Sequence, residues 1–115
     1  MAERVFHCPV EVAMDVIGRR WTAVILAHLK ARPRRYSELH RLIPDITEKM
    51  LTQRLAELVD DGVVARTERP TAGRHVEYGL TELGRSLEPA LQALYDWGEF
   101  WADERALAID EPFVD

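Results

Sequence analysis

The sequence predicts a mainly α-helical fold with one small β-hairpin. Two neighbouring segments, 36–43 and 47–61, carry apolar residues at the three- and four-residue steps of amphipathic helices. A short turn that contains Pro44 separates them. Two runs with a β bias, 63–69 and 75–80, then lie on either side of a loop that contains glycine and proline. Two helices joined by a tight turn and followed by a hairpin are the plan of a winged helix-turn-helix.

The first two helices are predicted from their apolar content and from their ends. The segment Cys8–Ile17 has Pro9 near its first helical position, where the N–H that proline lacks would have no partner, and Gly18 is expected to end it. The segment Trp21–Ala31 is apolar over most of its circumference, and Pro33 ends it. A helix of that composition is expected at the centre of the fold.

The third and fourth helices have distinct inner faces. In the third, one face at helical spacing is formed by Tyr36, Leu39, Leu42 and Ile43. The fourth begins at Thr47, a good N-cap residue, with Ile46 and Leu51 placed as a hydrophobic staple, and Gly62 ends it. Its predicted buried stripe consists of Thr47, Leu51, Leu55 and Leu58. The opposite side carries Lys49, Thr52, Gln53 and Ala56.

The end of the chain is predicted to return to helix after the hairpin. The hairpin loop spans residues 70–74, and a helical region begins at Thr81 and reaches about Ala108. Pro89 should kink this region or split it into two helices. Residues 109–115 are expected to be frayed. Because the chain shows no internal repeat and no linker, residues 1–115 are predicted to form a single domain.

The charge of the chain is divided between its middle and its end. The net charge is −5, yet residues 19–81 hold twelve Lys or Arg against eight Asp or Glu, whereas residues 82–115 hold nine acids and two arginines. Phosphate attraction depends on charge within a Debye length of roughly 8 Å, so the acidic end should point away from any nucleic acid. No segment resembles a membrane span or a signal peptide, and we therefore expect a cytoplasmic protein with no membrane partner.

Several motifs across residues 8–101 are similar to those of a known family, in the family's order and spacing. They are Cys8-Pro9, Gly18-Arg-Arg-Trp21, Arg35-Tyr36-Ser-Glu-Leu39, Ile46-Thr-Glu-Lys-Met-Leu-Thr-Gln-Arg-Leu55, Asp61-Gly-Val-Val64-Ala-Arg66, Val76-Glu-Tyr-Gly-Leu-Thr-Glu-Leu-Gly84 and Trp97-Gly98. The chain resembles the HxlR-type winged helix-turn-helix transcriptional regulators, relatives of the MarR-like group. It departs from them in Arg19-Arg20, where the family usually has Gly-Lys, and in Asp45, where the family usually has glycine. The acid at Asp45 would trim phosphate affinity or tune selectivity.

The resemblance implies a cytoplasmic homodimer that binds operator DNA and dimerises through its N- and C-terminal helices. A two-fold dimer is expected to place its recognition helices on the half-sites of a pseudo-palindrome, about one helical turn apart. Several family members sense oxidants or electrophiles through the cysteine of the Cys-Pro position, and others respond to small aldehydes or quinones. An oxidant, an electrophile or a small ligand is therefore the expected effector.

The predicted DNA contacts are of two kinds. The candidates for base readout are Lys49, Thr52 and Gln53, because lysine can donate to guanine and glutamine can bridge adenine in the major groove. The candidates for backbone or wing contact are Arg34, Arg35, Tyr36, Thr47, Arg69, Arg74 and His75. The alternative for every one of these residues is an ordinary solvated surface.

Cys8 and the last helix are the other candidate sites. As the single cysteine, Cys8 excludes a disulfide within the chain. A thiolate at a helix start gains from the helix dipole, which suits a redox sensor, whereas a small buried residue at a dimer contact is the alternative. The side chains predicted to form the dimer interface are Leu94, Trp97, Phe100 and Trp101. A small-molecule pocket lined by these aromatic residues is the alternative.

We expect no metal, no cofactor and no enzymatic activity. The four histidines lack the spacing of metal ligands. A thiol enzyme would need a base and an orienting acid beside Cys8, and only His7 is adjacent. The leading prediction is a sequence-specific DNA-binding transcriptional regulator. The alternative is a winged-helix module that binds protein without binding DNA, against which the basic stretch 19–41 argues.

Overall fold

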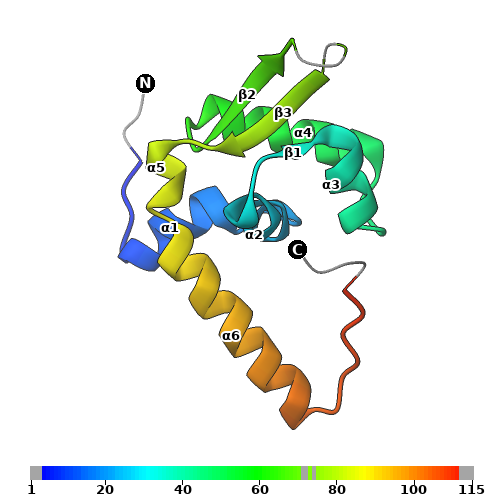
Figure 1. The fold of residues 1–115 in the computed structure, drawn as a ribbon. Helices are drawn as coiled ribbons and strands as arrows, with labels where there is room; N and C mark the ends of the chain where they lie inside the picture. Colours follow the sequence, from blue (N-terminus) through cyan, green and yellow to red (C-terminus); the bar gives the residue numbers. More distant parts are fainter. Residues whose placement is uncertain (1–3, 71–72, 74, 112–115) are drawn as a thin grey trace.

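The computed structural model describes residues 4–70, 73 and 75–111, and within them the chain forms six helices and three strands (Figure 1). The helices are α1 (Pro9–Ile17), α2 (Thr22–Ala31), α3 (Tyr36–Leu42), α4 (Glu48–Asp60), α5 (Glu82–Arg85) and α6 (Glu88–Glu104). The strands are β1 (Arg34–Arg35), β2 (Val64–Arg69) and β3 (His75–Leu80). The predicted fold class, mainly helical with a small wing, is confirmed.

The wing has three strands, one more than the sequence predicts. All are antiparallel, and their order is β1-β3-β2. In the expected hairpin, Val64 lies opposite Leu80 and Arg69 lies opposite His75. The added strand β1 places Arg34 opposite Tyr78, on the other edge of β3. The wing is therefore fixed to the start of α3 as well as to the end of α4.

Helix α2 occupies the centre of the core, as its composition predicts. Ile25 and Leu26 are fully buried in it. Around α2 the core is completed by Leu39, Leu51, Leu55, Leu58, Val64 and Leu91. The helix begins one residue later than expected, because Trp21 is its N-cap and has a left-handed backbone with φ of 76°. Such a conformation is costly for a large side chain.

The helical end of the chain is split into α5 and α6, which is one of the two outcomes that Pro89 predicts. Proline stands at the start of α6, where helices tolerate it. Figure 1 shows α6 running away from the rest of the fold, while the chain after it turns back toward α3. Residues 109–111 are placed beside the fold, and residues 112–115, the rest of the end predicted to fray, lie outside the described residues.

Gly84 allows α5 to pack closely on the start of β2. A Cβ atom at this buried position would lie 2.1 Å from the carbonyl oxygen of Val63. We expect Gly84→Ala to lower the free energy of unfolding by about 1–3 kcal/mol, because backbone atoms must move. Gly98 in α6 is the matched control, since a Cβ there meets nothing within 4 Å. Gly98→Ala should raise the free energy of unfolding by up to about 1 kcal/mol. Urea unfolding measures both values, and an equal change in the two variants would contradict these expectations.

Candidate nucleic-acid interface

Helix α4 turns one face to the core and the other to solvent. Leu51, Leu55 and Leu58 are at most 1% exposed, which confirms the apolar part of the predicted stripe. Thr47, the fourth predicted member, is exposed, because as the N-cap it stands at the end of the helix. The opposite side presents Lys49 and Gln53, both exposed. Surface exposure of these two side chains is the first requirement for base readout. Their contact with bases stays a prediction.

The start of α4 is fixed by a cap and by a bond from α3. The Thr47 Oγ1 atom accepts a hydrogen bond from the Met50 backbone N–H at 3.1 Å, so the predicted N-cap is confirmed. From α3, the Tyr36 hydroxyl donates to the Glu48 carbonyl at 3.0 Å and lies 3.0 Å from Thr52 Oγ1. Tyr36 is half-buried and holds two turns of α4 in register with α3. The Thr52 hydroxyl is exposed but already has Tyr36 as an intramolecular partner.

Arg34 is not available as a DNA contact, and that part of the prediction is wrong. Its exposed fraction is 2%, and its Nε donates to the backbone carbonyl of His28 at 3.2 Å. The physical reason is β1: pairing with β3 turns the Arg34 side chain toward the end of α2. Arg34 therefore belongs to the structure that joins the wing to α2.

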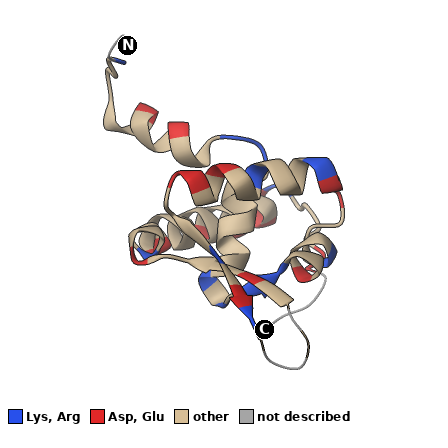
Figure 2. Ribbon diagram, turned by 90° about the horizontal axis from the view of Figure 1, so that it is seen from above, with Lys and Arg blue, Asp and Glu red and all other residues tan. Residues whose placement is uncertain are grey.

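Four side chains form a connected charged cluster on the wing. The Arg69 Nε donates to Glu77 Oε1 at 3.0 Å, and His75 Nε2 lies 3.5 Å from Glu77 Oε2. Arg35 adds a hydrogen bond from its guanidinium to His75 Nδ1 at 3.0 Å. The hydrogen bond from Arg69, with a smaller effect of His75, lowers the pKa of the Glu77 carboxyl. Figure 2 shows such acidic and basic positions side by side on the sheet.

The cluster unites three predicted wing residues through one acid that the sequence analysis missed. Arg35, Arg69 and His75 were predicted as separate contacts, and Glu77 was not considered. The alternation of charged residues along β3 is the signal that could have indicated it, because His75 and Glu77 fall on the same face of a strand. Arg74, also predicted for the wing, lies outside the described residues.

A second acid, Glu57, ties the basic stretch to α4. Arg54 donates to Glu57 Oε1 at 2.7 Å, and Arg19 approaches the same oxygen at 3.6 Å. The hydrogen bond from Arg54 is the main cause that lowers the pKa of Glu57. Arg54 also donates to the Arg20 carbonyl at 2.9 Å. Part of the positive charge that the sequence places before α3, that of Arg19, is thus paired with an acid of the same chain.

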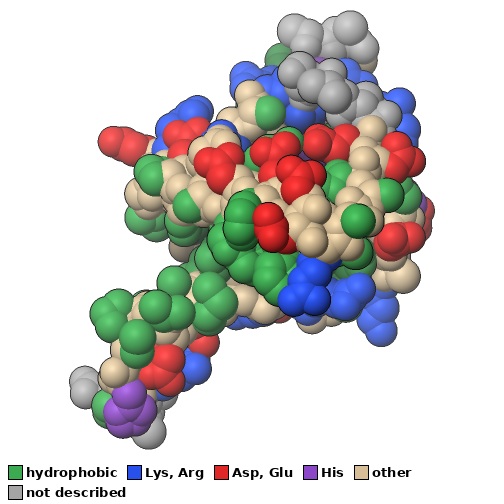
Figure 3. Space-filling view, turned by 90° about the horizontal axis from the view of Figure 1, so that it is seen from below, with side chains coloured by type: hydrophobic (Ala, Val, Ile, Leu, Met, Phe, Trp, Pro, Cys, Tyr) green, Lys and Arg blue, Asp and Glu red, His purple; other side chains and the backbone are tan. Residues whose placement is uncertain are grey.

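The candidate sensor and the candidate dimer interface both lie on the surface. Cys8 is the exposed N-cap residue of α1. On α6, Leu94 is 49% exposed, and Trp97, Phe100 and Trp101 are also exposed. The Trp97 and Trp101 rings stack with centroids 5.3 Å apart. Figure 3 shows further hydrophobic side chains along the projecting N-terminal arm, to which Val10, Val12 and Met14 contribute.

Comparison with known proteins places this arrangement in a family. A model of the HxlR-like helix-turn-helix family matches residues 16–106. The chain belongs to this family. It is 45% identical over 96 residues to YdeP, an uncharacterized HTH-type transcriptional regulator of Bacillus subtilis, and the match covers 84% of this chain and 75% of YdeP.

Solved structures of two regulators have the same fold. The redox regulator HypR in its reduced form is 40% identical, with a TM-score of 0.78 and coverage of 88% of this chain and 100% of HypR. The quinone-bound YodB of B. subtilis is 34% identical, with a TM-score of 0.65 and coverage of 80% and 98%. The resemblance drawn from the sequence is thereby confirmed, and the chain is a winged helix-turn-helix transcriptional regulator.

Within the part of the chain that the structure describes, no group of three or more His, Cys, Asp or Glu residues is placed to hold a metal ion. In the same residues, no helix has both the length and the apolar character needed to cross a membrane.

Proposed function

We propose that this HxlR-like regulator binds double-stranded DNA as a homodimer, with α4 of each copy in the major groove. The observation that supports this most is the outward side of α4. Lys49 and Gln53 project from a helix whose other face is buried and whose start is held by Thr47 and Tyr36. A rigid helix with exposed polar side chains is what direct readout requires.

The remaining contacts are proposed to be with the DNA backbone. The first N–H groups of α4 can bind a phosphate beside Thr47, since a helix N-terminus attracts anions. On the wing, Arg35 and Arg69 carry positive charge near Arg74 in the sequence, and His75 is hydrogen-bonded to Arg35. Glu77 holds Arg69 and His75 together, so they would approach the backbone as a unit. Such contacts position the protein without reading sequence.

The homodimer is supported by apolar surface at both ends of the chain. Val10 on α1 is 62% exposed, and Trp97 on α6 is 59% exposed. Exposed apolar groups gathered on two helices mark an interface. A second copy of the chain would cover the apolar surface of both helices. Two-fold symmetry then places the two α4 helices on half-sites of a pseudo-palindrome about one helical turn apart.

DNA binding should weaken steeply as salt is added. Each phosphate contact releases counterions, so log affinity falls against log salt with a slope of about −0.9 per contact. We expect measurable binding of a generic duplex at low salt, and Arg35→Gln should reduce the slope by about one for each half-site. Fluorescence anisotropy of a labelled duplex measures both. Absence of duplex binding at low salt would instead favour the protein-binding module.

An oxidant or electrophile is the proposed effector, with Cys8 as its target. HypR is a redox regulator, and a solved YodB structure is quinone-bound. In the present chain Cys8 is exposed at the start of α1, one of the two helices proposed for the dimer. Modification of the thiol could therefore alter the relation between the two copies and hence the spacing of the α4 helices.

We expect Cys8→Ser to remove the response to oxidants. Treatment of the parent protein with diamide or a quinone should change its DNA affinity by roughly 5- to 150-fold, the usual range of coupling between sites. The variant should bind DNA like the untreated parent both before and after treatment. Reversal of the diamide effect in the parent by a thiol reductant is the control. An equal response of parent and variant would show that Cys8 is not the sensor.

A further inference from the structure

A cavity of about 580 Å³ lies between α2, α6, the turn before α4 and the chain that follows α6. Its walls are largely apolar and include Val24, Leu42 and Leu94. The returning chain adds Leu107 and Ile109 on the outer side (Figure 1). This volume and this lining are typical of a site for a small organic molecule, whose cavities measure roughly 300–1,000 Å³.

The cavity uses a face of α6 that differs from the proposed dimer face. Leu94, Gly98 and Ala102 follow one another at four-residue steps and line the cavity. Trp97 and Trp101 stack on the neighbouring face. Gly98 leaves open space, since a Cβ atom there would meet nothing within 4 Å. Leu94 lies where the two faces meet, so a dimer through the tryptophans leaves most of the cavity accessible.

The outer wall is held in place by two hydrogen bonds. The Tyr95 hydroxyl donates to Glu111 Oε1 at 3.0 Å, and the Leu107 N–H donates to the Ala102 carbonyl at 2.8 Å. Just after the end of α6, Ala106 has a positive φ of 53°, and the chain turns back sharply there. The returning segment is thus a built wall of the cavity.

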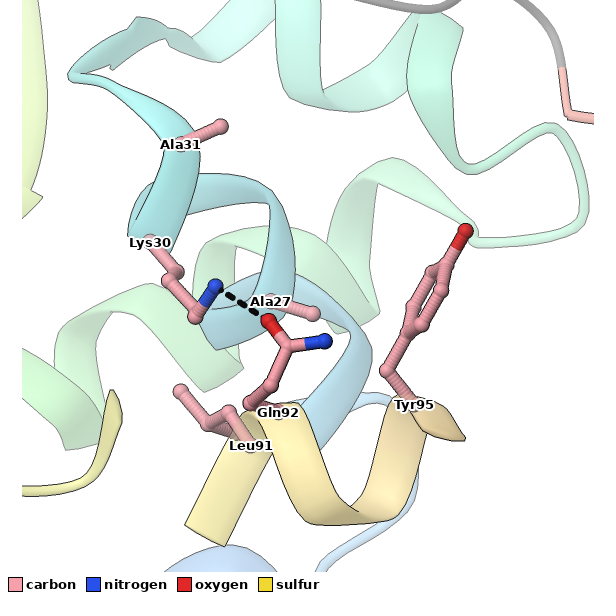
Figure 4. Close-up of a pocket in the computed structure, with 6 residues that line it drawn as sticks. All are labelled: Ala27, Lys30, Ala31, Leu91, Gln92 and Tyr95. Carbon is pink, nitrogen blue, oxygen red and sulfur yellow. Dashed lines mark hydrogen bonds between the residues drawn. The ribbon is translucent and has the colours of Figure 1, made fainter. Parts of the chain in front are cut away.

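The charge around the cavity is negative. Four carboxylates line it, those of Asp45, Glu99, Asp110 and Glu111, and among the described lining residues there is no lysine or arginine. The hydrogen bond to Glu111, together with the charges of Glu111 and Glu99, raises the pKa of the Tyr95 hydroxyl. Figure 4 shows the adjoining pocket, in which the Lys30 Nζ donates a hydrogen bond to Gln92 Oε1 at 2.7 Å. That lysine lines only the adjoining pocket, and the basic groups nearest the larger cavity are the His28 imidazole on its wall and the Arg20 guanidinium, which lies 4.7 Å from the Trp21 ring centroid.

We propose that the cavity binds a lipophilic organic cation. Its hydrocarbon or aromatic groups would occupy the apolar interior beside Val24 and Gly98, with the Trp21 and Tyr95 rings on the walls. Its positive charge would lie among the carboxylates of Asp45, Glu99 and Glu111. An aromatic ring can add a cation–π attraction to that of the carboxylates. A neutral ligand would gain no charge–charge attraction from the acidic lining, and an anion would be repelled.

A ligand in the cavity can affect the position of the DNA-binding helix α4, a consequence that rests on the proposed function. Ile43, Pro44 and Asp45 form one wall of the cavity and lead directly into Thr47, the N-cap of α4. A ligand that displaces this turn would alter the start of α4. Cation binding itself is measured on the protein without DNA, so its outcome is independent of whether the chain binds an operator.

The test uses two ions of the same shape and opposite charge. Tetraphenylphosphonium and tetraphenylborate are titrated into the full chain by isothermal titration calorimetry. We expect the cation to bind once per chain and at least about tenfold more tightly than the anion, because the carboxylates attract one and repel the other. Equal affinity for both ions would overturn the proposal, since it would indicate only apolar adsorption.

Three variants locate the site. Glu99→Gln removes one carboxylate and should weaken cation binding by roughly fivefold, whereas Glu104→Gln, an exposed acid on the same helix outside the cavity, should leave it unchanged. Gly98→Leu should abolish binding by filling the space, and it removes a helix-weakening glycine, so circular dichroism should show an intact fold. Unchanged binding by Gly98→Leu would overturn the proposal. The proposal would also be overturned if a monomeric variant bound the cation and the parent protein did not. That result would show that a second copy of the chain fills the cavity.

Discussion

Replacing Lys49 and Gln53 together by alanine is expected to abolish sequence-specific DNA binding while the fold stays intact. A good bidentate contact to a base contributes about 1–3 kcal/mol of discrimination, so loss of both weakens operator binding by roughly 30-fold to 10⁴-fold per half-site. Both side chains are exposed, and alanine favours helix. The midpoint of thermal unfolding should therefore hardly change.

The two single variants should separate readout from charge. Gln53→Ala should relax the choice of base at one position of each half-site and keep the salt dependence of the parent. Lys49→Ala should weaken binding and, to the extent that lysine also neutralises phosphate, reduce the salt slope. Arg85→Ala is the matched control, because it removes an exposed cation from α5, away from α4. The operator is first obtained by selection from random duplexes.

The comparison that decides this prediction is between the selected operator and a scrambled duplex of equal length. In the parent the two affinities should differ by several orders of magnitude at fixed salt, as is usual for specific binding. In the double variant they should converge. If the double variant still separated the two duplexes as the parent does, the wing or another helix would carry the readout, and α4 would only position the protein.

The sequence predicted α4 best, because its evidence is local. Its N-cap, its apolar stripe and its C-terminal glycine all lie within one segment, and each has its own physical signal. A kink or a split near Pro89 was predicted for the same reason, and the structure has the split. The exposed side of α4 then followed from the buried one, which is why the positions of Lys49 and Gln53 on the surface could be named in advance.

The features that were missed depend on contacts between distant residues. Strand β1 is only two residues long and both are arginines, so it has no periodicity and no β bias. Arginine is usually exposed, and the backbone carbonyl that accepts a hydrogen bond from the buried Arg34 belongs to His28 in helix α2. The cavity also depends on where residues 107–111 fold back, which no local pattern predicts. Local signals thus predict elements, whereas the packing of the elements fixes the site.

Replacing Trp97 and Trp101 by glutamate is expected to convert the proposed dimer into a monomer and to remove most of the affinity for the full operator. Each aromatic side chain can bury about 150–250 Å², and at roughly 25 cal/mol per Å² the pair supplies several kcal/mol to association. Introduced carboxylates would have to be desolvated beside the acidic end of the chain. Light scattering measures the mass, and anisotropy measures DNA binding.

Separate binding to full and half operators shows how the loss arises. Linking two half-site contacts through a dimer raises affinity by about 10²- to 10⁴-fold without any new contact to DNA. The monomer should therefore lose that factor on the full operator and bind a half-site duplex as the parent subunit does. The unchanged half-site affinity is the sign that the α4 surface is still intact.

Leu83→Glu on α5 is the matched control for this prediction. Leu83 has the same 59% exposed fraction as Trp97 but lies outside the α6 aromatic surface. It should remain dimeric and bind the full operator like the parent. A double tryptophan variant that stayed dimeric would place the interface on α1 alone. A monomeric Leu83→Glu would place it on α5, and in either case the two α4 helices would be set at a different spacing on the DNA.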